Sequence, residues 1–157
     1  RLVGATLREA IHDSRGEGQQ SSSKLKASVI VGGQIKGGAP TLFMFYPEGN
    51  FIEITDDNPF FQIGEAKYGK HILVRAYEPD MSFEDTIKLL LVSFDSTIKA
   101  NLSVGLPLDL QVYAKDSFEV SNKPRINVGD PYFEAISSGW SDALRNALTQ
   151  LPSYKND

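Results

Sequence analysis

The sequence predicts one α+β domain spanning residues 1–157, with antiparallel sheets and helices layered on them. Two observations predict this fold class. Apolar residues alternate, or run continuously, in short segments bounded by turn residues, which is typical of strands joined by hairpins. In longer segments the apolar residues recur at helical spacing. Hairpin-linked strands favour an antiparallel sheet over the parallel sheet of α/β proteins, and the chain length suits a single core.

The first part of the chain is predicted to hold a helix and several strands. Apolar side chains at helical spacing indicate a helix over 1–14, and the polar segment 16–24 is a flexible connector. Strand-type runs follow at 27–31, closed by Gly32 and Gly33, at 41–46, at 51–55 and around Phe60 and Phe61. The turn residues 47–50 join the middle two into a hairpin, and the continuous apolar run 41–46 suggests burial on both faces.

The sequence then changes to a helical period. Gly64, Glu65 and Ala66 are expected to begin a short helix directly after the Phe60 strand. A long helix begins at a capping box formed by Ser82 and Asp85 and stops before Asn101. Its core-facing stripe comprises Ile87, Leu90, Leu91, Phe94 and Ile98.

The last part of the chain is predicted to be a hairpin followed by a helix. The hairpin strands are 108–113 and 118–120. Asp130 as N-cap and Pro131 at the first helical position open the terminal helix. Its broad apolar face comprises Phe133, Ile136, Trp140, Ala143, Leu144, Ala147, Leu148 and Leu151. The helix ends at Pro152, and residues 152–157 are expected to form a loose tail.

Composition and charge exclude several classes of function. A net charge of −4, without a Lys/Arg cluster, argues against nucleic-acid binding. No apolar run of about 18 residues is present, so no membrane span is expected. The sequence has no cysteine, which excludes disulfides, thiolate metal sites and a cysteine nucleophile. His12 and His71 lack a second histidine at ligand spacing, so no metal site is expected. The default compartment is the cytoplasm.

Two segments invite a catalytic interpretation and do not support it. The segment GGQIKGGAP at 32–40 lacks the Gly-Lys-[Ser/Thr] ending of a phosphate-binding loop and runs into a strand, so a turn or flexible loop is favoured. The acidic segment TDDNP at 55–59 has turn chemistry and is interpreted as a solvated loop. A Gly-x-Ser-x-Gly nucleophile elbow does not occur.

Two other places could carry chemistry. At Gly64, Glu65 and Ala66, free backbone N–H groups at the start of a helix would favour an anion or an oxyanion. At Asn101–Gly105, a helix ends in a loop over the sheet that bears Asn101 and Ser103. Each place also has a purely structural interpretation. Gly64 can serve as a hinge, and Asn101 can mark the C-terminus of the helix. Composition and spacing leave these alternatives open.

Four segments together resemble the Anbu family of bacterial proteasome-like peptidases. They are VIVGGQI, TLFMFYPEGNFIEIT, PFFQIGEAKYGKHIL and LLLVSFDSTIKANLSVGLPLDLQVY. The resemblance covers about residues 1–151, and its most specific pieces are GNFIE, QIGE, KYGK and VSFDST. It implies the four-layer αββα fold of N-terminal-nucleophile hydrolases, and assembly of identical subunits into a ring or an open spiral. It implies no metal and no cofactor, and a short peptide or an unfolded polypeptide as substrate.

The resemblance also implies the chemistry and the supporting residues. The hydroxyl of an N-terminal Thr attacks the peptide carbonyl while its α-amine takes the proton, and a Lys and an Asp tune this pair. These residues are expected before Arg1, so the chain resembles the C-terminal portion of the subunit, without the front part of the fold. Glu65 stands where proteasome β-subunits carry a supporting Ser between two glycines, and it would orient the α-amine or cap the helix. Asn101 and Ser103 resemble the family's Asp-x-x-Ser-Gly segment with altered spacing, and Gly64, Ala66 and Gly105 would supply the substrate and oxyanion loop.

Two functions remain open from the sequence. In the first, the intact protein is a threonine peptidase, and this chain supplies its scaffold, supporting active-site loops and assembly surfaces. In the second, the protein is a non-catalytic, self-assembling scaffold or binding subunit that kept the fold. The first residue of the mature intact protein distinguishes them, because only an N-terminal Thr can act as its own nucleophile and base. A third reading, an unrelated small-ligand domain, requires the resemblance to be coincidental.

Overall fold

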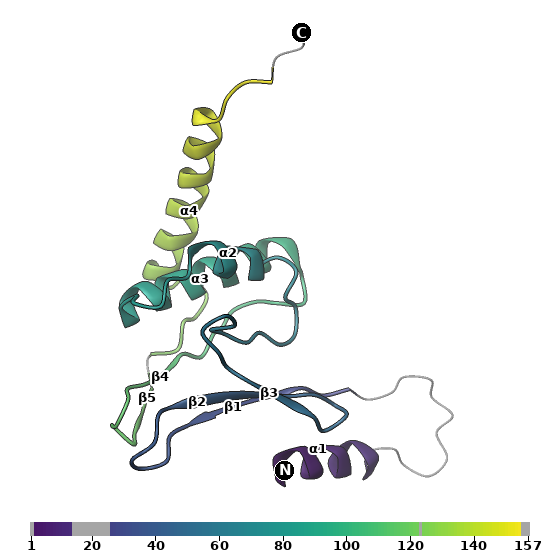
Figure 1. The fold of residues 1–157 in the computed structure, drawn as a ribbon. Helices are drawn as coiled ribbons and strands as arrows, with labels where there is room; N and C mark the ends of the chain where they lie inside the picture. Colours follow the sequence, from purple (N-terminus) through teal and green to yellow (C-terminus); the bar gives the residue numbers. More distant parts are fainter. Residues whose placement is uncertain (1, 14–25, 123, 155–157) are drawn as a thin grey trace, which may run out of the picture. The chain divides into compact units, whose positions relative to one another are not determined.

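The computed structural model describes residues 2–13, 26–122 and 124–154. Its elements, labelled in Figure 1, are α1 (Leu2–Asp13), β1 (Val29–Gly33), β2 (Thr41–Phe45), β3 (Phe51–Glu53), α2 (Lys70–Ala76), α3 (Phe83–Ala100), β4 (Gln111–Tyr113), β5 (Val120–Asn122) and α4 (Pro131–Gln150). The chain divides into two compact units, Arg1–Gly64 with Tyr113–Val120 and Glu65–Val112 with Ser121–Asp157. The predicted α+β order of elements is confirmed. The predicted connector 16–24 and residues 155–157 of the predicted tail lie outside the described residues.

The first unit contains an antiparallel sheet in the order β1-β2-β3. Val31 pairs with Phe43, and Phe45 pairs with Phe51, so the predicted 41–55 hairpin is confirmed. Phe43, Phe45 and Phe51 lie on one face with ring centroids 5.3–6.5 Å apart. Burial on both faces of 41–46 was expected, but only Phe45 is buried and its neighbours in the strand are half-buried.

Helix α1 contacts the turn between β2 and β3. A Cβ added to Gly4 would lie 2.2 Å from the Gly49 carbonyl oxygen, so only glycine fits at this position. Gly49 itself has φ +84°, a conformation in which side chains are strained. The predicted helix over 1–14 is therefore confirmed, and the close approach explains the glycine within it.

Gln34 holds the β1–β2 turn together with the turn after β4. Its side-chain amide donates hydrogen bonds to the Gly38 carbonyl at 2.8 Å and to Asp116 Oδ1 at 2.6 Å. Its side-chain carbonyl accepts hydrogen bonds from the Tyr113 hydroxyl at 2.9 Å and from the Asp116 N–H at 2.8 Å. The segment between β1 and β2 is thus a hairpin turn, in agreement with the turn or loop predicted for 32–40, and the side chain of Gln34 is fully hydrogen-bonded.

Several predicted strand bounds are wrong. Strand β1 runs through Gly32 and Gly33 because both pair with β2. The strand expected around Phe60 and Phe61 does not form: a bridge between Thr55 and Asn58 turns the chain back, and no described strand pairs with the residues that follow.

The predicted hairpin 108–120 is shorter and shifted. Leu108 makes an isolated bridge with Ile126 instead of extending β4. Asp116 and Phe118 adopt φ values of +63° and +51°, which lengthen the turn. Strand β5 therefore begins only at Val120.

The second unit is built on α2, α3 and α4. Its buried core comprises Leu91, Ile126 and Phe133, packed against the half-buried residues Ile87, Ile98, Leu106, Leu108 and Ile136. A Cβ on Gly69 would lie 2.3 Å from Ser93 Oγ, so this glycine allows the start of α2 to approach α3 closely. The KYGK motif thus has a packing explanation.

The predicted apolar faces of α3 and α4 are buried only in part. Phe94 was expected in the core, yet it is 42% exposed because no described element covers it. The face of α4 is buried at Phe133, whereas Leu144 and Leu148 are exposed, the latter by 70%. None of the described helices is long and apolar enough to cross a membrane.

The N-terminus of α3 carries the predicted capping residues. Ser82 Oγ accepts a hydrogen bond from the Asp85 N–H at 3.1 Å, and it donates one to Asp85 Oδ2 at 3.0 Å. Lys88 donates to Asp85 Oδ1 at 2.6 Å. The hydrogen bond from Lys88, followed by that from Ser82, lowers the pKa of Asp85 below its ordinary value of 3.8.

Acid is expected to weaken this end of α3. Because the pKa of Asp85 is lowered in the folded protein, its ionised form stabilises the fold above the ordinary pKa of 3.8, and this contribution is lost as the pH falls through the lowered pKa. Wild type and Asp85→Asn should therefore differ in melting temperature at neutral pH and converge in strong acid. Asp80→Asn is the matched control. A difference equally large at both pH values would contradict the prediction.

A buried charge links α3 to α4. The Asp95 side chain is 4% exposed, and Lys99 donates a hydrogen bond to its Oδ2 at 3.1 Å. The same ammonium group donates to Ser141 Oγ at 3.0 Å and to the Ser137 carbonyl at 3.4 Å. Lys99 therefore neutralises a buried carboxylate and holds the two helices together.

Lys99→Met is expected to lower the free energy of unfolding by roughly 1–3 kcal/mol, because it leaves the Asp95 carboxylate buried without its cation. Adding Asp95→Asn should recover part of the loss, since the double variant buries no charge. Urea unfolding of the wild type, Lys99→Met and the double variant measures both effects. A double variant less stable than Lys99→Met would exclude the buried charge as the cause.

Candidate active-site network

The segment from Gly64 to Gly69 is a turn that precedes α2. Gly64 has φ +81°, as a glycine hinge requires. The helix expected to begin at Gly64–Ala66 instead begins at Lys70, with Gly69 as its N-cap. The reason is local: Glu65 Oε1 accepts a hydrogen bond from the Lys67 N–H at 2.9 Å and holds the chain in a turn that competes with helix. Glu65 therefore does not cap α2.

The second candidate segment begins where α3 ends. Asn101 is the C-cap, and its N–H donates to the Thr97 carbonyl at 2.9 Å, so the predicted helix end is confirmed. Its side-chain oxygen accepts hydrogen bonds from the Ser103 N–H at 2.9 Å and from Ser103 Oγ at 2.7 Å. Asn101 thus fixes both the backbone and the hydroxyl of Ser103.

The two segments meet through one hydrogen bond. Asn101 Nδ2 donates to Glu65 Oε2 at 2.9 Å. Because the other end of the Asn101 amide accepts from Ser103, the amide can take only one orientation. Glu65, Asn101 and Ser103 therefore form a continuous network, and all three belong to the second unit.

The other predicted site residues, Gly64, Ala66 and Gly105, are close to the network residues along the chain. The Ala66 carbonyl accepts from the Lys70 N–H at 3.3 Å. Gly64 and Gly105 are exposed, and apart from their chain neighbours no described atom lies within 4 Å of where a Cβ would stand on either of them. The hydrogen bonds that define the network do not involve Gly64, Ala66 or Gly105, so the role of these residues as a substrate or oxyanion loop stays a prediction.

The arrangement determines which chemistry each group can support. Glu65 and Asn101 are half-buried, whereas Ser103 is exposed. The Ser103 hydroxyl donates a hydrogen bond to the Asn101 amide oxygen. Because an amide oxygen is not a base, this contact does not activate Ser103 as a nucleophile. Its oxygen keeps lone pairs that can accept a hydrogen bond from an ammonium or hydroxyl group. The network is therefore suited to positioning and charge stabilisation.

Sequence reasoning named these residues without finding their connection. Glu65 and Asn101 are 36 residues apart in the chain, and no local pattern predicts their contact. The link between Lys99 and Asp95, one turn before Asn101, was also missed. Its only sequence signal was the four-residue spacing of opposite charges on a helix.

The comparisons agree with this architecture. Residues 7–110 match a protein-family model described as Proteasome subunit. Among solved structures, Anbu from Hyphomicrobium sp. strain MC1 is 49% identical with a TM-score of 0.87, and the match covers 99% of this chain and 62% of that one. Anbu (ancestral beta-subunit) from Yersinia bercovieri is 44% identical with a TM-score of 0.88, covering 99% of this chain and 64% of its own. The Anbu complex from Pseudomonas aeruginosa, described as a helical assembly, is 46% identical with a TM-score of 0.90 and the same coverage.

The fold and the match over 7–110 define a proteasome-type subunit, and the chain belongs to the proteasome subunit family. Within that family it groups with the Anbu proteins, as the resemblance implied. The chain spans 62–64% of the length of these three relatives. A search of curated proteins found no match.

Proposed function

We propose that this chain is part of a proteasome-like threonine peptidase subunit that hydrolyses peptide bonds. The observation that carries the proposal is the network of Glu65, Asn101 and Ser103, which occurs at two segments where the family carries active-site supporting residues. In this proposal the nucleophilic Thr and its Lys and Asp partners belong to the part of the relatives' length that this chain does not span.

Each group of the network has a supporting role in the proposed reaction. The Thr hydroxyl attacks the peptide carbonyl and passes its proton to the Thr α-amine, which then protonates the leaving amine; water hydrolyses the resulting ester. Ser103 Oγ accepts a hydrogen bond from the α-ammonium, and Glu65 adds negative charge that stabilises this cation. Asn101 orients both side chains. Backbone N–H groups near Gly64 and Gly105 would stabilise the oxyanion.

The proposal includes assembly of identical subunits into a ring or an open spiral. The Anbu complex from Pseudomonas aeruginosa, 46% identical to this chain, forms a helical assembly. Substrates would be short peptides or unfolded polypeptides.

The test uses the intact subunit, purified and subjected to N-terminal sequencing and to assays with fluorogenic peptides. A mature N-terminal Thr, together with hydrolysis that is lost when this Thr is replaced by alanine, is the expected result. A different first residue, or an N-terminal Thr without hydrolysis of any peptide in a diverse library, would support the non-catalytic scaffold instead.

A further inference from the structure

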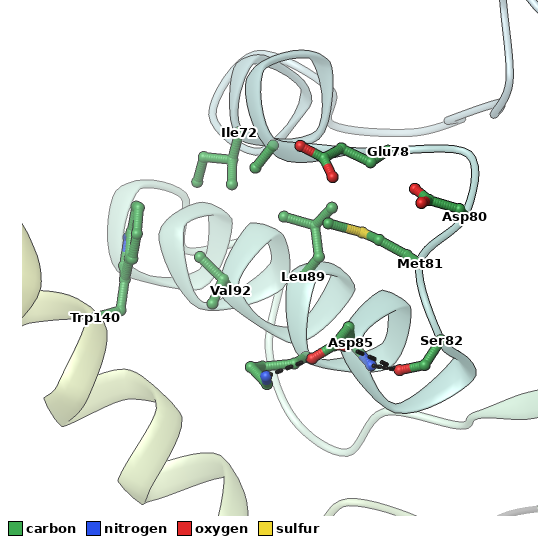
Figure 2. Close-up of a pocket in the computed structure, with 11 residues that line it drawn as sticks. Ile72, Glu78, Asp80, Met81, Ser82, Asp85, Leu89, Val92 and Trp140 are labelled. Carbon is green, nitrogen blue, oxygen red and sulfur yellow. Dashed lines mark hydrogen bonds and ion pairs between the residues drawn. The ribbon is translucent and has the colours of Figure 1, made fainter.

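Helix α2 lies directly against α3 at its N-terminal end and leaves a groove farther along. The groove has a volume of about 660 Å³, and Ile72 of α2 and Leu89 of α3 line it from its two sides (Figure 2). At the start of α2, a Cβ added to Gly69 would stand 2.3 Å from Ser93 Oγ, 2.8 Å from the Ser93 carbonyl oxygen and 2.9 Å from Thr97 Oγ1. The close contact thus lies at the end of α2 that adjoins the candidate network.

What glycine supplies at position 69 is space. Its φ of −97° and ψ of −30° lie in the right-handed region that other residues also adopt, so the backbone conformation does not require glycine. The atoms that face it cannot easily withdraw: Ser93 and Thr97 are each 4% exposed, and Thr97 Oγ1 donates a hydrogen bond to the Ser93 carbonyl at 2.9 Å. Any larger residue would therefore have to push α2 away from α3.

This contact joins the two segments that form the network. Glu65 stands four residues before Gly69, and its Oε1 accepts a hydrogen bond from the Lys67 N–H at 2.9 Å, which holds the turn between them. On α3, Asn101 follows Thr97 by one helical turn, and its N–H donates to the Thr97 carbonyl at 2.9 Å. The contact of Gly69 with Thr97 therefore connects the turn that carries Glu65 to the helix end that carries Asn101.

The hydrogen bond between these segments tolerates little displacement. Asn101 Nδ2 and Glu65 Oε2 are 2.9 Å apart. A carbon atom in contact with an oxygen normally stays about 3.3 Å or more away, so a methyl group at position 69 requires a shift of about 1 Å. A shift of that size across the network would lengthen the hydrogen bond beyond about 3.5 Å, where it is lost.

We propose that Gly69 is a positioning residue of the proposed peptidase. By allowing the start of α2 to touch α3, it sets the distance across which Asn101 holds the Glu65 carboxylate. Gly69 touches no reacting group itself and acts only through Glu65. The inference rests on the proposed function, in which Glu65 stabilises the α-ammonium group of the nucleophilic Thr.

Gly69→Ala in the intact subunit tests this role. It should lower kcat for peptide hydrolysis by about 10- to 100-fold with little change in KM, because a supporting group displaced by about 1 Å no longer stabilises the transition state. In a Glu65→Ala background no carboxylate remains to be positioned, so adding Gly69→Ala should cost no further kcat. The melting temperature should fall in both backgrounds, since the crowding against Ser93 and Thr97 does not depend on Glu65.

Gly139→Ala is the matched control. Gly139 lies within α4, and apart from its chain neighbours and the backbone of its own helix no described atom lies within 4 Å of where a Cβ would stand. This variant should keep the wild-type kcat. Should Gly69→Ala be too unstable to assay, Thr97→Val replaces the hydroxyl that faces Gly69 with a bulkier methyl group, and it should lower kcat less, again only when Glu65 is present.

Two results would overturn the positioning role alone. They are an unchanged kcat in Gly69→Ala, and a loss of kcat by the same factor with and without Glu65, which would show a general structural effect. In both cases the wild-type subunit still hydrolyses peptides, so the proposed function stands. A wild-type subunit that hydrolyses no peptide would overturn the proposed function together with the role of Gly69.

Discussion

Replacing Phe133 with alanine is expected to lower the free energy of unfolding by about 3–5 kcal/mol. Phe133 is 6% exposed and packs with Leu91 and Ile126 in the core of the second unit. The substitution removes the largest side chain of this buried cluster and leaves a cavity that the surrounding helices can fill only in part. Urea unfolding of the intact subunit, followed by circular dichroism, measures the loss.

Tyr132→Ala is a closely matched control. Tyr132 precedes Phe133 on α4, has a similar size and is 53% exposed. The N–H groups of both residues donate to the same N-cap carboxylate of Asp130, and neither substitution removes these bonds. The control should change stability by no more than about 0.5 kcal/mol. Equal losses for the two variants would show that α4 does not dock through Phe133.

Sequence patterns predicted those parts of the fold that short-range interactions determine. The starts of α3 and α4 were found because Ser82 and Asp130 cap backbone N–H groups within three residues of their own positions. The hairpin 41–55 was found because its turn residues and its apolar alternation lie in one continuous segment. In each case the partner atoms are near in sequence.

The errors occur where distant contacts decide the outcome. Phe60 and Phe61 have strand character, but a strand forms only if another pairs with it, and β-propensity does not report that. Phe94 and Leu148 follow the helical period of their buried neighbours, yet they stay exposed because nothing described packs against them. Periodicity identifies a face that can be buried, and packing decides whether it is.

The candidate site shows the same division. The family resemblance named Glu65, Asn101 and Ser103, and the bonds from Asn101 to Ser103 are local. The hydrogen bond from Asn101 to Glu65 joins segments that only the packing of α2 on α3 brings together. It converts two separate candidates into one network, and this connection makes the supporting role testable.

Asn101→Asp is expected to lower kcat for the proposed peptide hydrolysis by about 100-fold, with little change in KM. The new carboxylate can still accept both bonds from Ser103. It cannot donate to Glu65, and it places a second negative charge where the two side chains now lie 2.9 Å apart. The repulsion should displace Glu65 and Ser103 from the positions in which they support the α-ammonium.

Reversing the hydrogen bond separates this positioning role from a general loss of structure. In the double variant Glu65→Gln/Asn101→Asp, the amide at position 65 can donate to the carboxylate at position 101, so the network closes again with one negative charge. Most of the lost kcat should return, while Asn146→Asp on the exposed face of α4 should leave kcat unchanged. If Asn101→Asp has wild-type kcat, or if the reversed pair recovers stability but no activity, the network is structural, and the supporting groups of the proposed peptidase must lie elsewhere in the subunit.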